Sequence, residues 1–283
     1  MSGVATVMGY ALRESLRRRV FVIVLILTVC FLALYALAAR EAFSEVTEFR
    51  GVVDEQERIL FGATLLGLAM FGTLFLGAVL AVFLTLGVVR GDAERGLLQP
   101  LVVRPIGRVQ LLVGRFLAAG AVCALYVFAV YLAAVAITDA IGGWSPDRLL
   151  LPGVSLAGGM LFLVAVSLLG SVFLSATANG IAIFMVFGAG LVGGLLGQLG
   201  EGLQSPTLED IGRNVSWALP FEALYQSGLS ALTEDTVGFA KIVVNLGPFG
   251  GARDMGAGIW PWTAAYTALV GVLAAVGFAR RDL

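Results

Sequence analysis

"LFGATLLGLAMFGTLFLGAVLAVFLTLGVV", residues 60–89, runs for thirty residues without one ionisable side chain. A bilayer core about 30 Å thick is crossed by roughly 20 apolar residues in a helix, whose backbone groups bond to one another. The stretch does not alternate with period two, as a strand of a membrane barrel would. It therefore predicts a membrane-spanning helix that tilts, kinks or projects beyond the bilayer.

The composition of the whole chain agrees with this stretch. Of its 283 residues, 59% are hydrophobic and 13% charged, with a mean hydropathy of +0.96. Soluble domains contain about 25% charged residues, so this chain lacks the polar surface of a globular protein. We expect a single all-α, polytopic membrane domain over residues 1–283, with six transmembrane helices. The five further apolar stretches are residues 20–39, 111–138, 153–175, 181–199 and 259–279.

Basic residues predict the orientation of these spans. With the N-terminus inside, the inside segments carry 11 Lys and Arg in 55 residues, and the outside segments carry 7 in 93 residues. Cytoplasmic segments are enriched in Lys and Arg, so both termini are predicted to be cytoplasmic. Residues 40–59 are then a solvated external loop, and residues 200–258 the longest external segment.

Residues 1–19 predict an amphipathic interface helix before the first span. Val4, Val7 and Ala11 recur at helical spacing, whereas the basic residues fall mainly elsewhere on the wheel. Two interpretations remain open: the arginines only orient the first span, or the helix also docks a partner. The basic residues in question are Arg13, Arg17 and Arg18.

Several kinds of chemistry are missing from the sequence. It contains no histidine and no GxxxxGK[ST], GxSxG, HExxH or CxxC motif, so we expect no catalytic residue, no metal site and no cofactor bound by this chain.

Arg115 is the only Asp, Glu, Lys, Arg or His residue in the six apolar stretches. Carriers driven by protons or sodium usually have such residues at membrane depth, so we expect transport energy to come from elsewhere, although a pore remains possible.

Glycines predict where helices bend or approach closely. Gly62, Gly67, Gly72 and Gly77 recur every five residues, do not share a face, and are expected to loosen their helix. By contrast, the fifth stretch has glycine pairs at the small-xxx-small spacing that is typical of close helix packing. These pairs are Gly190 with Gly194 and Gly193 with Gly197.

Two shorter segments predict local structure. "TANG", residues 177–180, is expected to form a tight turn between the fourth and fifth spans.

Pro220 can start a helix with Phe221, Leu224 and Tyr225 on its apolar side. We expect Glu222 and Gln226 to lie off that side, and the helix to lie on the outer membrane surface or to cap the bundle.

The loop "RGDAERGLLQPLVVRPIGR", residues 90–108, separates the second and third spans. Asp92 can cap a short helix that Pro100 stops, with Leu97 and Leu98 on one surface and Glu94 and Arg95 beside them. Such a helix, between two helix-breaking segments, would transmit a displacement as a rigid body. An ordinary cytoplasmic hairpin with orienting arginines is the alternative.

The motifs of this loop resemble those of ABC-2 type permeases. "ERGLL" at 94–98, "RPIGR" at 104–108, "LLVGRF" at 111–116 and the terminal "FARRDL" at 278–283 occur in the family's order, although Leu97 and Arg115 replace its usual Thr and Lys. The resemblance implies the permease subunit of an exporter in the prokaryotic plasma (inner) membrane. The residues that would couple it to its partner are Asp92, Glu94, Arg95, Gly96, Leu97, Leu98, Arg104, Pro105 and Arg108.

The same resemblance implies the partners. A separate ATP-binding cassette subunit would bind ATP and Mg²⁺, and a second permease chain, identical or different, would complete the complex. No nucleic acid is expected. The length and the acidic first external loop most resemble the branch that includes the permease of nitrous-oxide reductase maturation.

Two functions from other classes stay open. The first is a membrane anchor or assembly factor without transport activity, which would hold a partner through residues 200–258. The second is an autonomous pore or carrier, which the uncharged spans disfavour.

Overall fold

All regular structure in the computed structural model is helical within the residues that it describes, which are 3–17, 19–50, 55–86, 107–232 and 253–280. The predicted all-α class is confirmed. The helices are α1 (Gly3–Arg17), α2 (Arg19–Arg50), α3 (Glu55–Thr85), α5 (Arg108–Gly142), α6 (Leu151–Phe173), α7 (Ala176–Leu203), α8 (Pro206–Ala218), α9 (Pro220–Leu232) and α11 (Ile259–Ala279).

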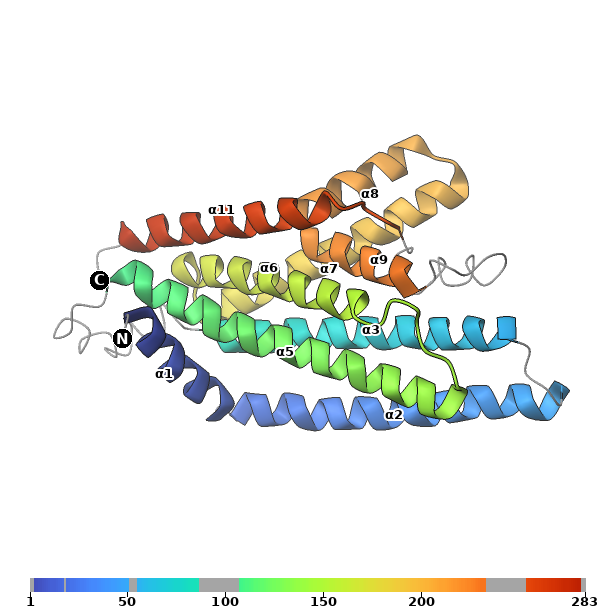
Figure 1. Ribbon diagram of the computed structural model, residues 1–283. Coiled ribbons are helices and arrows are strands. Elements are labelled where there is room, and N and C mark those ends of the chain that lie inside the picture. The colour runs from blue at the N-terminus through green and yellow to red at the C-terminus, as the bar shows by residue number, and fades with distance from the viewer. Residues whose placement is uncertain (1–2, 18, 51–54, 87–106, 233–252, 281–283) are drawn as a thin grey trace.

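Six of these helices are long and apolar enough to cross a membrane. They are α2, α3, α5, α6, α7 and α11, and each overlaps one of the six predicted stretches. They pack side by side into an elongated bundle, with α6 between α5 and α11 (Figure 1). The prediction of six transmembrane helices is confirmed.

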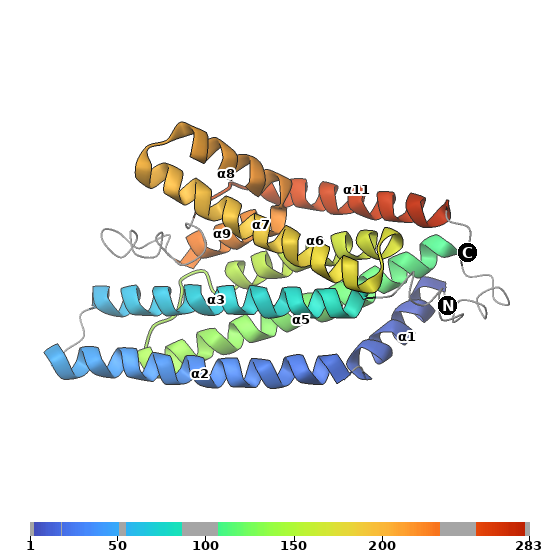
Figure 2. The ribbon, with the colours of Figure 1, turned by 180° about the vertical axis from the view of Figure 1, so that it is seen from behind.

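The ends of the helices fall into two groups. The end of α3, the start of α5, the turn between α6 and α7, the end of α11 and the start of α1 lie at one end of the bundle (Figures 1 and 2). We call this the loop end, because α3 ends and α5 begins there. The end of α2, the start of α3 and the connections from α5 to α6 and from α7 to α8 lie at the opposite end.

The expectation of a solvated loop over residues 40–59 is wrong. Helix α2 continues to Arg50 and α3 begins at Glu55. Ala, Glu and Arg are good helix formers, so α2 and α3 extend into this polar segment over residues 40–50 and 55–59. Glu55 and Glu57 in the first turn of α3 also complement its dipole.

The four glycines of α3 do not loosen it, contrary to expectation, since the helix is continuous from Glu55 to Thr85. Three of them instead admit side chains from different elements. A methyl group on Gly62, Gly72 or Gly77 would collide with Trp144, Phe31 or Val127, respectively. Their spacing of five residues directs them to different neighbours, so they serve packing on several faces of a largely buried helix.

The glycine pairs of α7 confirm the prediction of close helix packing. Gly190 faces the ring of Phe221, and a methyl group on Gly197 would lie 3.4 Å from the Cα atom of Gly212 in α8. Gly193 and Gly194 likewise lie directly against residues of α8 and α9. The small-residue side of α7 is therefore covered by α8 and α9 within the same chain.

The predicted turn "TANG" is helical instead. Helix α7 begins at Ala176, and the Ser175 side chain caps it by accepting a hydrogen bond from the backbone N–H of Ala178. The residues between α6 and α7 are Leu174 and Ser175 alone. The serine cap starts the helix before Asn179 and Gly180 can form a turn.

Helix α9 begins at Pro220, as predicted, but does not lie on a surface. All its residues are buried except Ser227 and Ser230, which are half-buried. It packs against α6, while α3, α7, α8 and α11 contact its other sides. The expected position on the outer membrane surface is therefore wrong. Glu222 and Gln226, expected off the apolar side, are buried against α7, where hydrogen bonds satisfy both side chains.

Candidate functional site: the loop end and the buried polar junctions

Helix α1 packs on the first turns of α5. Val7 and Ala11 are buried in this contact. A methyl group on Gly114 would lie 2.7 Å from the Val7 Cγ1 atom, so the two helices can approach this closely only with glycine there. The apolar side of α1, which the sequence identified, thus has a protein partner in α5.

An ion pair joins the same two helices. The Arg115 guanidinium donates to Glu14 Oε2 at 3.0 Å, and the two side chains are 18% and 44% exposed. Arg115 is the one ionisable residue that the sequence placed inside a span. Its pairing with Glu14, 101 positions earlier, was missed because the sequence does not indicate which helices meet.

The predicted interface and coupling residues are described only in part. Arg13 lies on the exposed side of α1, Arg17 ends α1, and Arg108 begins α5, although the side chains of the last two are not described. The remaining predicted residues lie outside the described residues. These are Arg18, Asp92, Glu94, Arg95, Gly96, Leu97, Leu98, Arg104 and Pro105.

A buried polar junction connects three spans near the loop end. The Thr85 hydroxyl at the end of α3 and the Ser167 hydroxyl of α6 are hydrogen-bonded at 2.5 Å. The Asn179 amide of α7 donates to the Ser167 carbonyl at 3.0 Å. These bonds link the last turn of α3, where residues 90–108 follow, through α6 to the first turns of α7.

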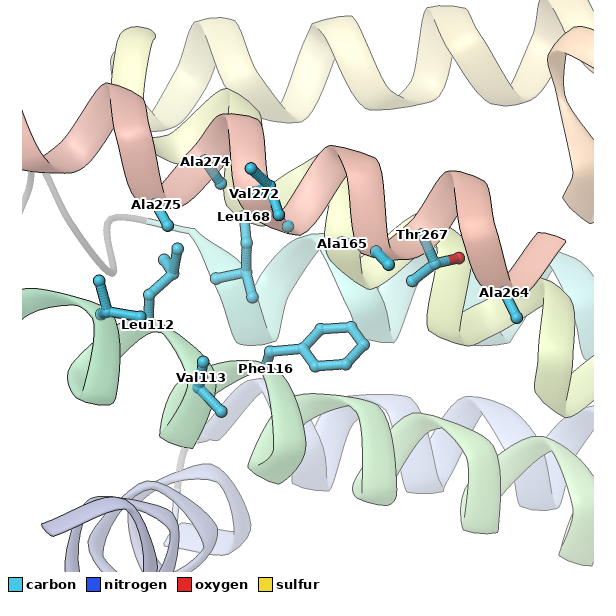
Figure 3. A pocket seen from close by; sticks show the side chains of 13 residues that line it. Leu112, Val113, Phe116, Ala165, Leu168, Ala264, Thr267, Val272, Ala274 and Ala275 are labelled. Atoms are coloured by element: carbon cyan, nitrogen blue, oxygen red, sulfur yellow. The ribbon is translucent and has the colours of Figure 1, made fainter. Parts of the chain in front are cut away.

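An apolar groove runs between α5, α6 and α11 (Figure 3). Its volume is about 460 Å³, and Phe116 of α5 lies across it from Ala264 of α11. Thr267 contributes the one polar side chain among the described residues that line it. A groove of this composition suits lipid chains or another apolar helix.

A carboxyl group is buried where α7, α8 and α9 meet. Glu222 of α9 is 0% exposed. The Ser216 hydroxyl of α8 donates to Glu222 Oε2 at 2.6 Å, and the Gln226 amide donates to Oε1. Burial raises the pKa of Glu222 to about 7, against the lowering effects of these hydrogen bonds and of Arg253. The sequence contains both polar residues, but nothing in it indicates that they are buried.

Comparison with known families finds a match over residues 5–283 to the family described as "ABC-2 family transporter protein". The matched range includes every described helix except the first two residues of α1. Comparison with curated proteins finds no match.

Proposed function

The chain belongs to the ABC-2 family of transporter proteins, and on this premise we propose that it is the permease subunit of an ATP-binding cassette exporter. A separate ATPase subunit binds ATP and Mg²⁺ and supplies the energy. The observation that carries the proposal is the match over residues 5–283, together with six candidate spans.

The loop end is the proposed docking side for the ATPase. The end of α3 and the start of α5 lie there, and α1 packs against α5 (Figure 1). The Thr85–Ser167–Asn179 junction then offers a route by which displacement of the loop moves α3 relative to α6 and α7. Buried hydrogen bonds resist separation, so the three spans respond together.

Residues 92–99 are proposed to form the coupling helix, with Arg104, Pro105 and Arg108 at its exit. Asp92 caps this helix, and Glu94, Arg95, Gly96, Leu97 and Leu98 contact the ATPase. Arg13, Arg17 and Arg18 of the N-terminal segment border the same contact. The α1–α5 packing supports this arrangement, because it fixes α1 to the helix that begins at Arg108.

We also propose that the loop end faces the cytoplasm of a prokaryotic cell. The higher density of Lys and Arg in segments at this end supports that orientation. A second permease chain, identical or different, pairs with this one in the membrane. The narrower resemblance to the nitrous-oxide reductase maturation branch stays a prediction.

An anchor or assembly factor without transport activity would need residues 200–258 as a free external segment. The described part of that segment contains α8 and α9, which pack against α7 and α6. This packing favours a role for α8 and α9 inside a transport domain.

The proposal is tested with the chain co-expressed with the ATPase encoded beside it and reconstituted in lipid nanodiscs. We expect the two proteins to co-purify. Gly96→Pro should then reduce ATP turnover to that of the ATPase alone, because proline inside a helix costs about 3 kcal/mol or more and breaks the coupling helix.

Arg148→Ala is the matched control, because Arg148 is exposed and lies in the connection from the end of α5 to the start of α6, which are opposite the loop end (Figure 1). It should leave ATP turnover unchanged. Equal turnover in wild type and Gly96→Pro, with both inserted and bound to the ATPase, would contradict the proposed coupling helix.

A further inference from the structure

Glu222 occupies an unusual position for a carboxyl group in this chain. It lies in the first turn of α9, has no exposed surface, and faces Gly194 of α7. A methyl group on Gly194 would collide with both the Glu222 carboxyl and the Gln226 amide. The carboxyl therefore rests directly on the backbone of α7.

The hydrogen-bond partners of Glu222 are neutral. Ser216 donates to one carboxyl oxygen at 2.6 Å, and Gln226 donates to the other. One donor for each oxygen supports the ionised form only partly, since a carboxylate accepts up to about four hydrogen bonds. A protonated carboxyl needs less compensation for burial than an ionised one.

Charged groups around the junction do not provide a direct counterion among the described residues. Neither α6 nor α7 has an ionisable residue between positions 151 and 199, and α3 has none between positions 59 and 85. Helix α11, which also packs on α9, has no Asp, Glu, Lys, Arg or His between positions 259 and 279, and its one phenol is Tyr266. Arg253 lowers the pKa of Glu222, but its guanidinium is paired with Glu201 of α7. On α8, Asp210 and Arg213 pair with each other on the exposed side. Glu209 of the same helix packs against Gly200 of α7. On α9, burial raises the pKa of the neighbouring phenol, Tyr225.

We infer that Glu222 is a proton-binding site that controls the packing of α8 and α9 on α7. The carboxyl is protonated when the three helices are closely packed, and it releases the proton when α8 and α9 separate from α7 and water reaches it. The glycines of α7 make this contact close, so a small separation is enough to hydrate the carboxyl.

The direction of the pH dependence follows from burial. The pKa of Glu222 is raised from the ordinary 4.5 to about 7 in the folded chain, so the folded state holds a proton that the unfolded state loses between these values. The contribution of Glu222 to stability is therefore complete below about pH 4.5 and is lost as the pH rises through about 7.

Infrared titration of the full chain in nanodiscs tests the inference without the ATPase or a substrate. We expect a protonated-carboxyl band that disappears with an apparent pKa near 7 and is absent from Glu222→Gln. Asp210→Asn is the matched control, because Asp210 lies on exposed surface of α8 and its replacement should leave the band unchanged. An apparent pKa near 4.5, or loss of the band in the control, would overturn the inference.

If Glu222→Gln does not fold, Ser216→Ala provides a second test of the inference. Removing the Ser216 hydroxyl takes a donor from the ionised carboxyl, so the apparent pKa should rise further. An unchanged or lower value would contradict the assignment of the band to Glu222.

Spin labels test the separation directly. Labels at Val192 of α7 and Asn214 of α8, both exposed, are attached in a chain whose Cys30 and Cys123 are replaced by serine. The distance distribution should broaden between pH 5 and pH 8, and Glu222→Gln should abolish the broadening. The same broadening in Glu222→Gln, or none in the parent chain, would overturn the control of packing.

Discussion

The chain stabilises two acidic side chains in opposite ways at two helix junctions. Glu14, where α1 meets α5, is 44% exposed and pairs with the cation Arg115 at 3.0 Å. Glu222, where α7, α8 and α9 meet, is fully buried and pairs with the neutral donors Ser216 and Gln226. The first carboxyl has a cation as its direct partner, whereas burial raises the pKa of the second to about 7.

The difference indicates separate roles for the two junctions. The α1–α5 contact combines apolar packing with an ion pair, and its strength should depend little on pH near neutrality. The junction at Glu222 depends on close approach of glycine backbones and on a group that titrates near neutrality. In the proposed transporter, the first holds α1 beside the coupling loop, and the second permits α8 and α9 to change their packing.

The largest effect is expected from a bulky residue at the buried junction. Gly194→Val would collide with the Glu222 carboxyl and the Gln226 amide, so we expect a loss of about 3 kcal/mol or more in the free energy of unfolding. Thermal unfolding of the purified chain measures it. Gly188→Ala is the matched control on the same helix, because nothing lies within 4 Å of a methyl group there.

That control should be neutral or slightly stabilising, since alanine favours a helix by up to about 1 kcal/mol over glycine. Equal stability of Gly194→Val and the parent chain would show that α8 and α9 do not pack closely on α7.

The smaller effect is expected at the ion pair. Glu14→Gln should cost at most about 1 kcal/mol, because partly exposed pairs are screened by water and salt. The loss should shrink at high salt, and the charge exchange Glu14→Arg with Arg115→Glu should restore most of it. If Glu14→Gln lost more free energy of unfolding than Gly194→Val, the ion pair would contribute more to stability than the buried junction, contrary to this comparison.

The spans could be predicted because their determinants are local. Thirty apolar residues at 60–89 need no knowledge of neighbours, and the small-xxx-small pairs of α7 follow from helical spacing alone. The same reasoning found the start of α9 at Pro220. The family motifs could also be recognised, since they are short sequence motifs in a fixed order.

The packing partners could not be predicted from the same patterns. The spacing of Gly62, Gly72 and Gly77 does not reveal which bulky side chain will fill each gap. Glu222 and Gln226 were expected off the apolar side of their helix. Their burial could not be predicted, because it depends on the contact with α7 and on the donor Ser216 of α8. The polar segment at 40–59 was predicted as a loop, although its helix-forming residues continue α2 and α3.

Site-specific cross-linking tests whether the loop end binds an ATPase. A photoreactive amino acid is placed at Leu97, within residues 90–108, and in a second chain at Arg148, in the connection from α5 to α6. We expect a cross-link from position 97 to the co-expressed ATPase and none from position 148. Cross-linking from position 148 but not from position 97 would contradict it.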